Sequence, residues 1–238
     1  MILEKRIAVI TGAGKGIGEA IANGLASIGF QTVLIGRTFE NLERVARNIL
    51  DNGGLAPSIR QLDINNTIKM KETVAAIVSD YKRIDVLVNN AGIFIDGTLE
   101  ISEAEFKTMI DTNLMAQFNL TKAVVPVMEK QRLGNIFNIV SRSGKIGFEG
   151  SGGYSASKFA MLGFSESLYR ELTPKGIKVT ALCPAWVNTQ MAFDSGSPLP
   201  AEEMIEPEDL FKTIKWLLEI SPSACVKEVV IESKKGIR

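Results

Sequence analysis

The amino-acid sequence predicts an α/β fold in which helices cover both faces of one doubly wound, parallel sheet of seven strands. Two observations predict this fold. Short runs of β-branched and other apolar residues alternate with longer stretches of helical periodicity along the whole chain, as expected of βα units around a parallel sheet. The first apolar run also ends in a glycine-rich turn that leads into a helical stretch.

The individual elements follow in order from this alternation. The predicted strands span residues 7–11, 32–35, 58–62, 86–89, 135–140, 178–182 and 228–231. Helices are predicted over 18–28, 42–50, 68–79, 105–131 and 155–172. Pro126 lies inside the fourth of these helices, so a kink is expected there. Two glycine-, serine- and proline-rich segments, 144–153 and 194–200, are expected to form loops.

Length and composition indicate one domain over residues 1–238 with a small-molecule ligand. The chain has 238 residues, of which 45% are hydrophobic, and this is enough for a sizeable core. The chain has 27 Lys and Arg residues and 27 Asp and Glu residues. This balanced charge does not indicate binding to nucleic acid or to an anionic membrane surface. No apolar run reaches membrane-spanning length, and the N-terminal residues lack the pattern of a secretory signal.

The numbers of cysteine and histidine residues limit which catalytic groups and metal sites the chain can have. The two cysteines, Cys183 and Cys225, indicate reduced thiols and a cytoplasmic setting, and Cys183 is interpreted as a core thiol in an apolar strand. Histidine is absent, which excludes the commonest general base, the Ser-His-Asp triad and nearly every catalytic zinc site. No metal is expected, and proton transfer must come from Tyr, Lys, Asp, Glu or Cys.

The turn after the first strand is a candidate dinucleotide site of the Rossmann type. A helix begins there, and N-terminal helix amides are where a pyrophosphate binds, with glycine allowing close approach of the backbone. The spacing is T-G-x-x-x-G-x-G, and the same residues could also form a tight turn without a ligand. The candidate contacts are Gly12, Gly14, Lys15, Gly16, Ile17 and Gly18.

The end of the second strand indicates NADP(H) as the cofactor. Enzymes that prefer NAD usually have an acidic residue there for the ribose 2′-hydroxyl. This chain has Arg37 instead, whose guanidinium group can pair with a 2′-phosphate, and Lys15 adds a positive charge on the same side. If both are only solvated surface charges, a measured cofactor preference will show it.

Two further strand ends supply candidate cofactor contacts. Asp63, followed by Ile64, comes after the third strand and has two compatible roles, a hydrogen bond to the adenine amino group or the cap of the next helix. Asn90, Ala91 and Gly92 follow the fourth strand at the carboxyl edge, where open α/β sheets bind ligands.

Tyr154 and Lys158 are the candidate catalytic pair. Their spacing of four residues places them on one face of a helix, one turn apart. A nearby ammonium group favours the phenolate and is expected to lower the pKa of the tyrosine toward the working range. Ser141 ends the fifth strand at the same edge and could bind the substrate oxygen as charge develops, with Ser143 as a nearby competitor.

Together these motifs resemble the short-chain dehydrogenase/reductase family, in its compact single-domain branch, over nearly the whole chain. The resemblance implies hydride transfer between a nicotinamide and a carbonyl, with Tyr154 as proton donor and Lys158 holding the nicotinamide ribose. It also implies that Ser141 orients the carbonyl and that Asn113 anchors a proton-relay water, although Asn113 could instead be satisfied inside its helix. The matching positions after the sixth strand add Pro184, Val187 and Thr189 as cofactor contacts.

The substrate is left open by the sequence. A short lid is expected around residues 190–205. Its apolar residues and others near the site are candidates for an apolar pocket or for ordinary core: Met191, Phe193, Pro198, Phe94, Ile146, Phe148 and Trp186. The chain resembles 3-oxoacyl-acyl-carrier-protein reductases and sepiapterin-reductase-like carbonyl reductases. Its last strand lacks the Val-Asp-Gly-Gly motif of many of the former, which weakens that assignment, and is more similar to the sepiapterin-reductase-like end. Reduction of a 3-oxoacyl thioester is nevertheless kept, with a sepiapterin-reductase-like or diketone carbonyl reductase as the alternative. A non-catalytic NADP(H)-binding sensor is the alternative of another class.

Relatives of this kind assemble as dimers or tetramers through two long helices, which correspond here to residues 105–131 and 155–172. A homodimer or homotetramer is therefore expected. Apolar residues on these helices could serve that interface or the core of one subunit: Phe118, Val124, Met161, Phe164 and Leu168. Arg142 and Lys145 flank the predicted site and are interpreted as surface charges, with attraction of an anionic substrate as the alternative.

Overall fold

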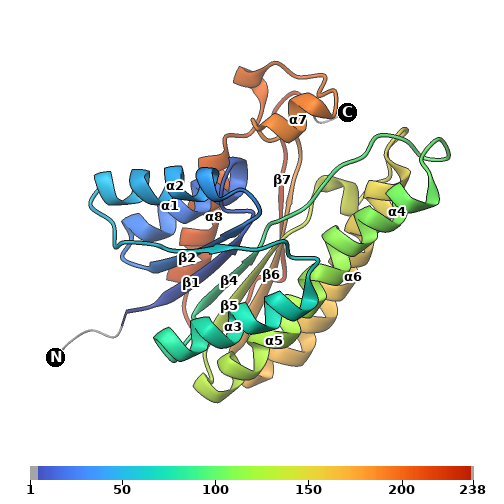
Figure 1. The fold of residues 1–238 in the computed structure, drawn as a ribbon. Helices are drawn as coiled ribbons and strands as arrows, with labels where there is room; N and C mark the ends of the chain where they lie inside the picture. The colour runs from blue at the N-terminus through green and yellow to red at the C-terminus, as the bar shows by residue number, and fades with distance from the viewer. Residues whose placement is uncertain (1–4, 237–238) are drawn as a thin grey trace.

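Seven parallel strands form a sheet with the order β3-β2-β1-β4-β5-β6-β7 in the computed structural model, which describes residues 5–236 (Figure 1). The strands are β1 (Ile7–Thr11), β2 (Gln31–Gly36), β3 (Ser58–Gln61), β4 (Val86–Asn89), β5 (Gly134–Ile139), β6 (Ile177–Pro184) and β7 (Glu228–Ile231). The predicted fold class is confirmed. The limits of β1, β4 and β7 agree with the prediction, and the other strands differ by one or two residues at their ends.

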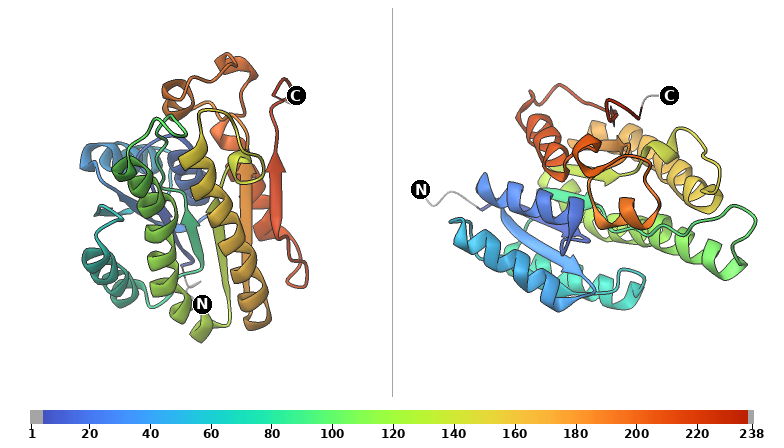
Figure 2. Two further views of the ribbon diagram at one scale, coloured as in Figure 1. Left: turned by 90° about the vertical axis from the view of Figure 1, so that its right-hand side faces the viewer. Right: turned by 90° about the horizontal axis from the view of Figure 1, so that it is seen from above.

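Helices cover both faces of this sheet. The α-helices are α1 (Gly16–Ser27), α2 (Phe39–Asp51), α3 (Thr67–Tyr81), α4 (Glu103–Ile110), α5 (Ala116–Gln131), α6 (Gly152–Leu172), α7 (Gln190–Asp194) and α8 (Pro207–Glu219). Helices α1, α2 and α8 lie on one face and α3, α5 and α6 on the other (Figures 1 and 2). Short 3₁₀ turns span Arg142–Gly144, Thr173–Lys175 and Ala201–Glu203.

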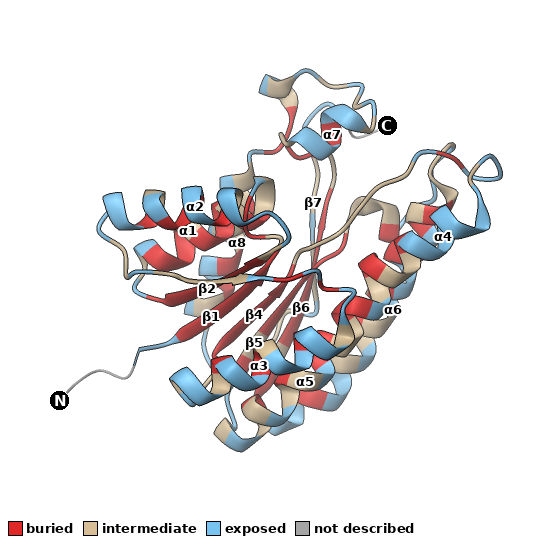
Figure 3. Ribbon diagram, viewed as in Figure 1, coloured by how far each residue is buried: buried red, intermediate tan, exposed pale blue. Residues whose placement is uncertain are grey.

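The alternation of side chains along the strands divides the core into two layers. In β1, Ala8 and Ile10 pack against α1, α2 and α8, whereas Ile7 and Val9 pack toward α3 and α5. The five inner strands are consequently buried almost throughout, whereas the edge strands β3 and β7 are partly exposed (Figure 3). Within residues 5–236, no helix combines the length and the hydropathy needed to cross a membrane.

The prediction of one helix over 105–131 was wrong. A capping box of Ser102 and Glu105 starts the helix at Glu103, and a π-helical turn, Asp111–Met115, separates α4 from α5. Pro126 lies inside α5, which remains helical through it, and a kink there stays a prediction. The departure from α-helical hydrogen bonding lies at the π turn. Helix α8 was not predicted, although Leu210, Ile214 and Leu217 follow a helical spacing and are buried.

Two of the apolar residues considered for a subunit interface belong to the core instead. Val124 and Met161 are buried within the subunit. Phe118 and Phe164 are partly exposed and stack edge to face between α5 and α6, with their ring centroids 5.7 Å apart. Assembly of the chain stays a prediction.

Candidate active site

The site lies at the carboxyl edge of the sheet, where β1 and β4 are neighbours and the chain leaves them in opposite directions. Such a switch point opens a crevice between the loops that follow the two strands. Thr11 joins these loops, because its hydroxyl accepts hydrogen bonds from the amides of Asn90 and Ala91 (both 3.0 Å) and donates to the Val88 carbonyl (3.2 Å). The Asn90 side-chain amide donates to the carbonyl of Thr11 (2.9 Å).

The glycine-rich loop lies tightly against these residues. Gly12 adopts φ +64°, which disfavours a residue with a side chain. A methyl group at Gly18 would lie 2.2 Å from the Gly12 carbonyl oxygen and 2.5 Å from the Asn90 side-chain nitrogen. No side chain caps the N-terminus of α1. The loop and the first turn of α1 therefore present backbone amides at the crevice, as a pyrophosphate site requires.

Arg44 holds this loop and was missed by the sequence analysis. Its guanidinium group donates to the carbonyl of Gly14 (3.0 Å) and forms a two-pronged ion pair with Glu19 (2.5 and 2.7 Å). It thereby ties α2 to the glycine loop and to the first turn of α1. Arg44 lies seven residues beyond Arg37 on the next helix, and no local motif signals its contact with Gly14.

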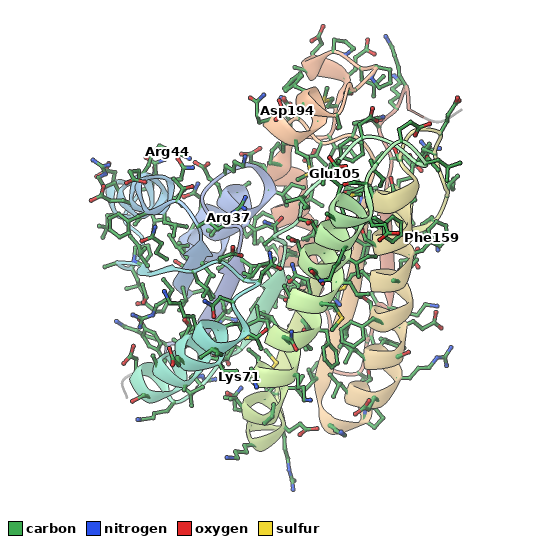
Figure 4. All side chains as sticks on the ribbon, turned by 45° about the vertical axis from the view of Figure 1, so that its right-hand side comes forward. Arg37, Arg44, Lys71, Glu105, Phe159 and Asp194 are labelled. Atoms are coloured by element: carbon green, nitrogen blue, oxygen red, sulfur yellow. The ribbon has the colours of Figure 1, made fainter. Side chains whose placement is uncertain are left out.

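The residues predicted to select the cofactor lie in the first two βα units. Arg37 follows β2 and is exposed, as is Lys15 in the glycine loop. In the part of the chain that the structure describes, no carboxylate forms an ion pair with Arg37. Figure 4 shows Arg37 and Arg44 on the same side of the molecule.

Asp63 does not cap the helix that follows it. Its carboxylate accepts from the amide of Asn65 (3.0 Å), whereas Asn66 is the N-cap of α3 and accepts from the amide of Lys69 (3.0 Å). The capping role considered for Asp63 was therefore wrong, because the helix begins one turn later than that role requires. Contact with adenine stays a prediction, as it does for the buried neighbour Ile64.

Ser141 and Tyr154 come together although they belong to different elements. The strand β5 ends at Ile139, and the chain then turns into the 3₁₀ turn Arg142–Gly144, so strand alternation does not extend to Ser143. Ser141 accepts a hydrogen bond from the Ser143 amide (3.0 Å), and its side chain is close enough to the Tyr154 hydroxyl to influence the pKa of that group. The partly exposed Tyr154 ring also packs edge to face on Phe94, with centroids 5.2 Å apart.

Lys158 is buried beneath Tyr154. Its ammonium nitrogen donates to the carbonyl of Ile139 at the end of β5 (3.0 Å) and lies 5.5 Å from the centre of the Tyr154 ring. A methyl group at Gly92 would be 3.8 Å from the same nitrogen. The side chain therefore joins α6 to the ends of β4 and β5.

Burial controls the ionisation of this pair. It raises the pKa of Tyr154 to about 12, although the neighbouring Ser141 side chain acts in the opposite direction. Burial lowers the pKa of Lys158 to about 8. The expectation that Lys158 lowers the pKa of Tyr154 was wrong for the protein alone, because the loss of solvent outweighs other effects. Tyr154 is therefore protonated at neutral pH.

Asn113 lies in the π turn and is buried. Its side chain exchanges two hydrogen bonds with the backbone of Ile93, at 2.8 and 2.9 Å, and donates to the Ser157 hydroxyl (3.0 Å). Its partners are thus on the loop after β4 and on α6, and the interpretation that its own helix satisfies it was wrong. The bond to Ser157, which is next to Lys158, attaches the π turn to the helix that carries the candidate pair.

The loop after β6 reaches the glycine loop from the other side. Pro184 ends β6, Val187 is buried, and Thr189 is the N-cap of α7. A methyl group at Gly16 would lie 3.1 Å from the Thr189 methyl carbon. The segment that contains the three residues predicted to contact the cofactor therefore reaches the glycine loop at Thr189, and their contact with the cofactor stays a prediction.

Apolar side chains are exposed on the two segments beside the site. They are Ile146, Phe148, Met191 and Phe193, which are between 39% and 49% exposed, so the interpretation of these four as ordinary core was wrong. The last two lie on α7, which stands above the carboxyl edge of the sheet (Figure 1). They suit a rim that accepts an apolar ligand.

The comparisons with known proteins agree with this geometry. Residues 6–198 match the short chain dehydrogenase family. The chain is 34% identical to a 3-oxoacyl-[acyl-carrier-protein] reductase of Synechocystis sp. over 222 residues, which are 90% of each chain. It is similar to the crystal structure of a β-ketoacyl-[ACP] reductase (FabG) from Bacteroides thetaiotaomicron, with a TM-score of 0.88 and 44% identity over 98% of this chain and 99% of that one. A metagenomic short-chain oxidoreductase in complex with NADP is 31% identical, with a TM-score of 0.84 over 96% and 97% of the two chains.

Proposed function

The chain belongs to the short-chain dehydrogenase family of oxidoreductases acting on CH–OH groups, and from this premise we propose that it reduces a ketone or aldehyde carbonyl with NADPH. One observation carries the proposal. The side chains of Ser141 and Tyr154 interact with each other, and the buried ammonium group of Lys158 lies 5.5 Å from the centre of the Tyr154 ring, beside the loop that follows β4. This arrangement offers an acid, an orienting hydroxyl and a cation at one place.

The residues present fit a nicotinamide dinucleotide. The glycine loop leaves no room for side chains at Gly12 and Gly18, and no side chain caps the first turn of α1, so the amides there would be available to a phosphate. Arg37 and Lys15 would hold the 2′-phosphate of NADPH, and Pro184, Val187 and Thr189 would lie along its nicotinamide end. When bound, NADPH supplies the hydride.

Side chains of the protein then supply the proton and orient the carbonyl. Tyr154, protonated because of its raised pKa, donates its proton to the carbonyl oxygen as negative charge develops there. The Ser141 hydroxyl donates a hydrogen bond to the same oxygen and thereby fixes its position. Lys158 carries positive charge at neutral pH and stabilises the phenolate that the transfer leaves behind. Asn113 holds Ser157 and so the start of α6.

A 3-oxoacyl thioester is the first substrate to test, because relatives at 34% and 44% identity are 3-oxoacyl-acyl-carrier-protein reductases. The exposed apolar rim formed by Ile146, Phe148, Met191 and Phe193 suits an acyl chain. The same rim would accept an apolar diketone or a pterin side chain. Sepiapterin and a diketone are therefore tested together with the thioester.

The experiment is NADPH oxidation followed by absorbance with an acetoacetyl thioester, sepiapterin, a diketone and an aromatic aldehyde. We expect clear turnover of one class, with the thioester as the leading candidate. Tight NADPH binding without turnover of any of them would contradict the reductase proposal and favour a cofactor-binding sensor.

Arg37→Ala tests the choice of cofactor. We expect the ratio of kcat/KM with NADPH to kcat/KM with NADH to fall by about tenfold to a hundredfold, because the variant loses a charge-assisted pair with the 2′-phosphate. The matched control is Arg47→Ala, which removes an exposed arginine from α2 where it pairs with Glu43. An unchanged ratio in the Arg37 variant would count against the 2′-phosphate assignment.

The lowered pKa of Lys158 predicts the pH dependence of cofactor use. The ammonium form predominates below pH about 8 and is lost as the pH rises through that value. We therefore expect kcat/KM for NADPH, which reports the free enzyme, to decrease above pH about 8. A pH profile from about 6 to 10 checks this, and a value that stays constant to the upper limit would contradict the role of the Lys158 charge.

A further inference from the structure

The turn that follows Ser141 rests on the helix carrying Tyr154 and Lys158. Ser141 is the N-cap of the 3₁₀ turn Arg142–Gly144. A methyl group at Gly144 would lie 2.7 Å from the Val140 side chain and 2.8 Å from the Lys158 carbonyl oxygen. Any movement of this turn would therefore displace the Ser141 hydroxyl relative to Tyr154.

Arg142 ties this turn to the C-terminal segment 232–236. Its side chain is only 14% exposed, and its Nε lies 3.2 Å from a carboxylate oxygen of Glu232. One terminal nitrogen donates to the carbonyl of Gly236 (2.7 Å), ninety-four positions along the chain. The guanidinium group also lies 5.5 Å from the centre of the Phe148 ring. The side chain thus has partners on three sides.

The C-terminal segment needs such an attachment. It follows β7, which is only four residues long and forms the edge of the sheet, paired with β6 alone (Figure 2). A second ion pair, between Lys145 and Glu228 (2.8 Å), joins the same turn region to the start of β7. Both cations beside Ser141 therefore have a carboxylate partner within the protein, so neither stands as a free site for an anionic substrate.

We propose that Arg142 is a positioning residue, which holds the Ser141 turn in place by clamping it to Glu232 and Gly236. This inference rests on the proposed carbonyl reduction, since Ser141 is the group through which Arg142 acts. The geometry of a polar contact at the reacting oxygen has a steep effect on rate, so a looser turn lowers kcat while the glycine loop and NADPH binding stay unaffected.

Three variants test the clamp without reference to any substrate. Arg142→Met and Glu232→Gln each break the ion pair, and Lys227→Met is the control, because Lys227 makes an exposed pair with Glu166 from the chain just before β7. Amide hydrogen exchange in peptides covering 141–151 and 228–236 should accelerate in the first two variants and not in the control. Equal exchange in Arg142→Met and the unmodified protein would overturn the proposal.

A double-mutant cycle then tests whether Arg142 acts through Ser141. We expect Arg142→Met to lower kcat by about tenfold to a hundredfold with an unchanged dissociation constant for NADPH, and Arg142→Lys to restore part of it. In a Ser141→Ala background the Arg142 effect should largely disappear, because the group that it positions is gone. If the losses of kcat in the two single variants simply add in the double variant, the proposal is overturned. It is also overturned if thermal unfolding shows that a lower folded fraction of Arg142→Met explains the loss of kcat.

These experiments distinguish a failure of the proposed carbonyl reduction from a failure of the proposed positioning role of Arg142. If the unmodified protein binds NADPH but reduces no carbonyl compound, the proposed function fails, and the exchange measurement alone decides whether Arg142 clamps the turn. If the protein is active and Arg142→Met changes neither exchange nor kcat, the proposed function stands and the positioning role of Arg142 is rejected.

Discussion

Replacing Tyr154 with phenylalanine is expected to lower kcat by a factor on the order of 10²–10⁴, while NADPH still binds. Phenylalanine keeps the ring that packs on Phe94 and removes only the hydroxyl that interacts with Ser141. Because desolvation raises the pKa of Tyr154, its hydroxyl is protonated at neutral pH and is the available proton donor beside the crevice. Steady-state kinetics and the quenching of protein fluorescence by NADPH measure the two effects separately.

The matched control is Tyr169→Phe. Tyr169 lies on the same helix, fifteen positions further along, where it packs against the core on the α3 and α5 face of the sheet. Its replacement removes a phenol of the same kind away from the crevice and should leave kcat unchanged. Near-normal turnover in Tyr154→Phe would reject Tyr154 as the acid, whatever the behaviour of the control.

Gly18→Ala is expected to have the second large effect, the loss of NADPH binding. The new methyl group would be 2.2 Å from the carbonyl oxygen of Gly12, which is backbone and cannot rotate away. The loop must therefore move from the position in which its amides face the crevice. We expect NADPH to bind at least tenfold more weakly, with a cost of about 1–3 kcal/mol in the free energy of unfolding.

Gly163→Ala provides the control for the added methyl group. Gly163 is also helical, but nothing lies within 4 Å of the position that its side chain would occupy. Alanine there should leave NADPH binding unchanged and stabilise the protein by up to about 1 kcal/mol. Fluorescence titration and thermal unfolding of both variants give the comparison. Wild-type affinity in Gly18→Ala would mean that the glycine loop does not hold the cofactor.

Two of the predictions that failed have different physical causes. The helix predicted over 105–131 contains a π turn at Asn113, whose side chain is hydrogen-bonded to the backbone of Ile93 and to Ser157. The hydrophobic periodicity of the sequence does not reveal these long-range hydrogen bonds. Asp63 resembled a helix cap by its type and place, yet Asn66 is the N-cap and the helix begins at Thr67. Local patterns predicted that the elements exist, but several local residues could have capped this helix, and only the structure shows which one does.

The sequence by itself determined the seven-stranded α/β fold, the glycine loop, the absence of an acidic residue after β2 and the placement of Tyr154 and Lys158 one turn apart. These features depend on neighbours within a few residues, which the sequence displays directly. Only the tertiary structure decided that Ser141 meets Tyr154, that Arg44 holds Gly14 and that Arg142 reaches Gly236. It also decided that burial, and not the nearby ammonium group, dominates the pKa of Tyr154. Burial and long-range contacts are made by residues that only the folded sheet brings together.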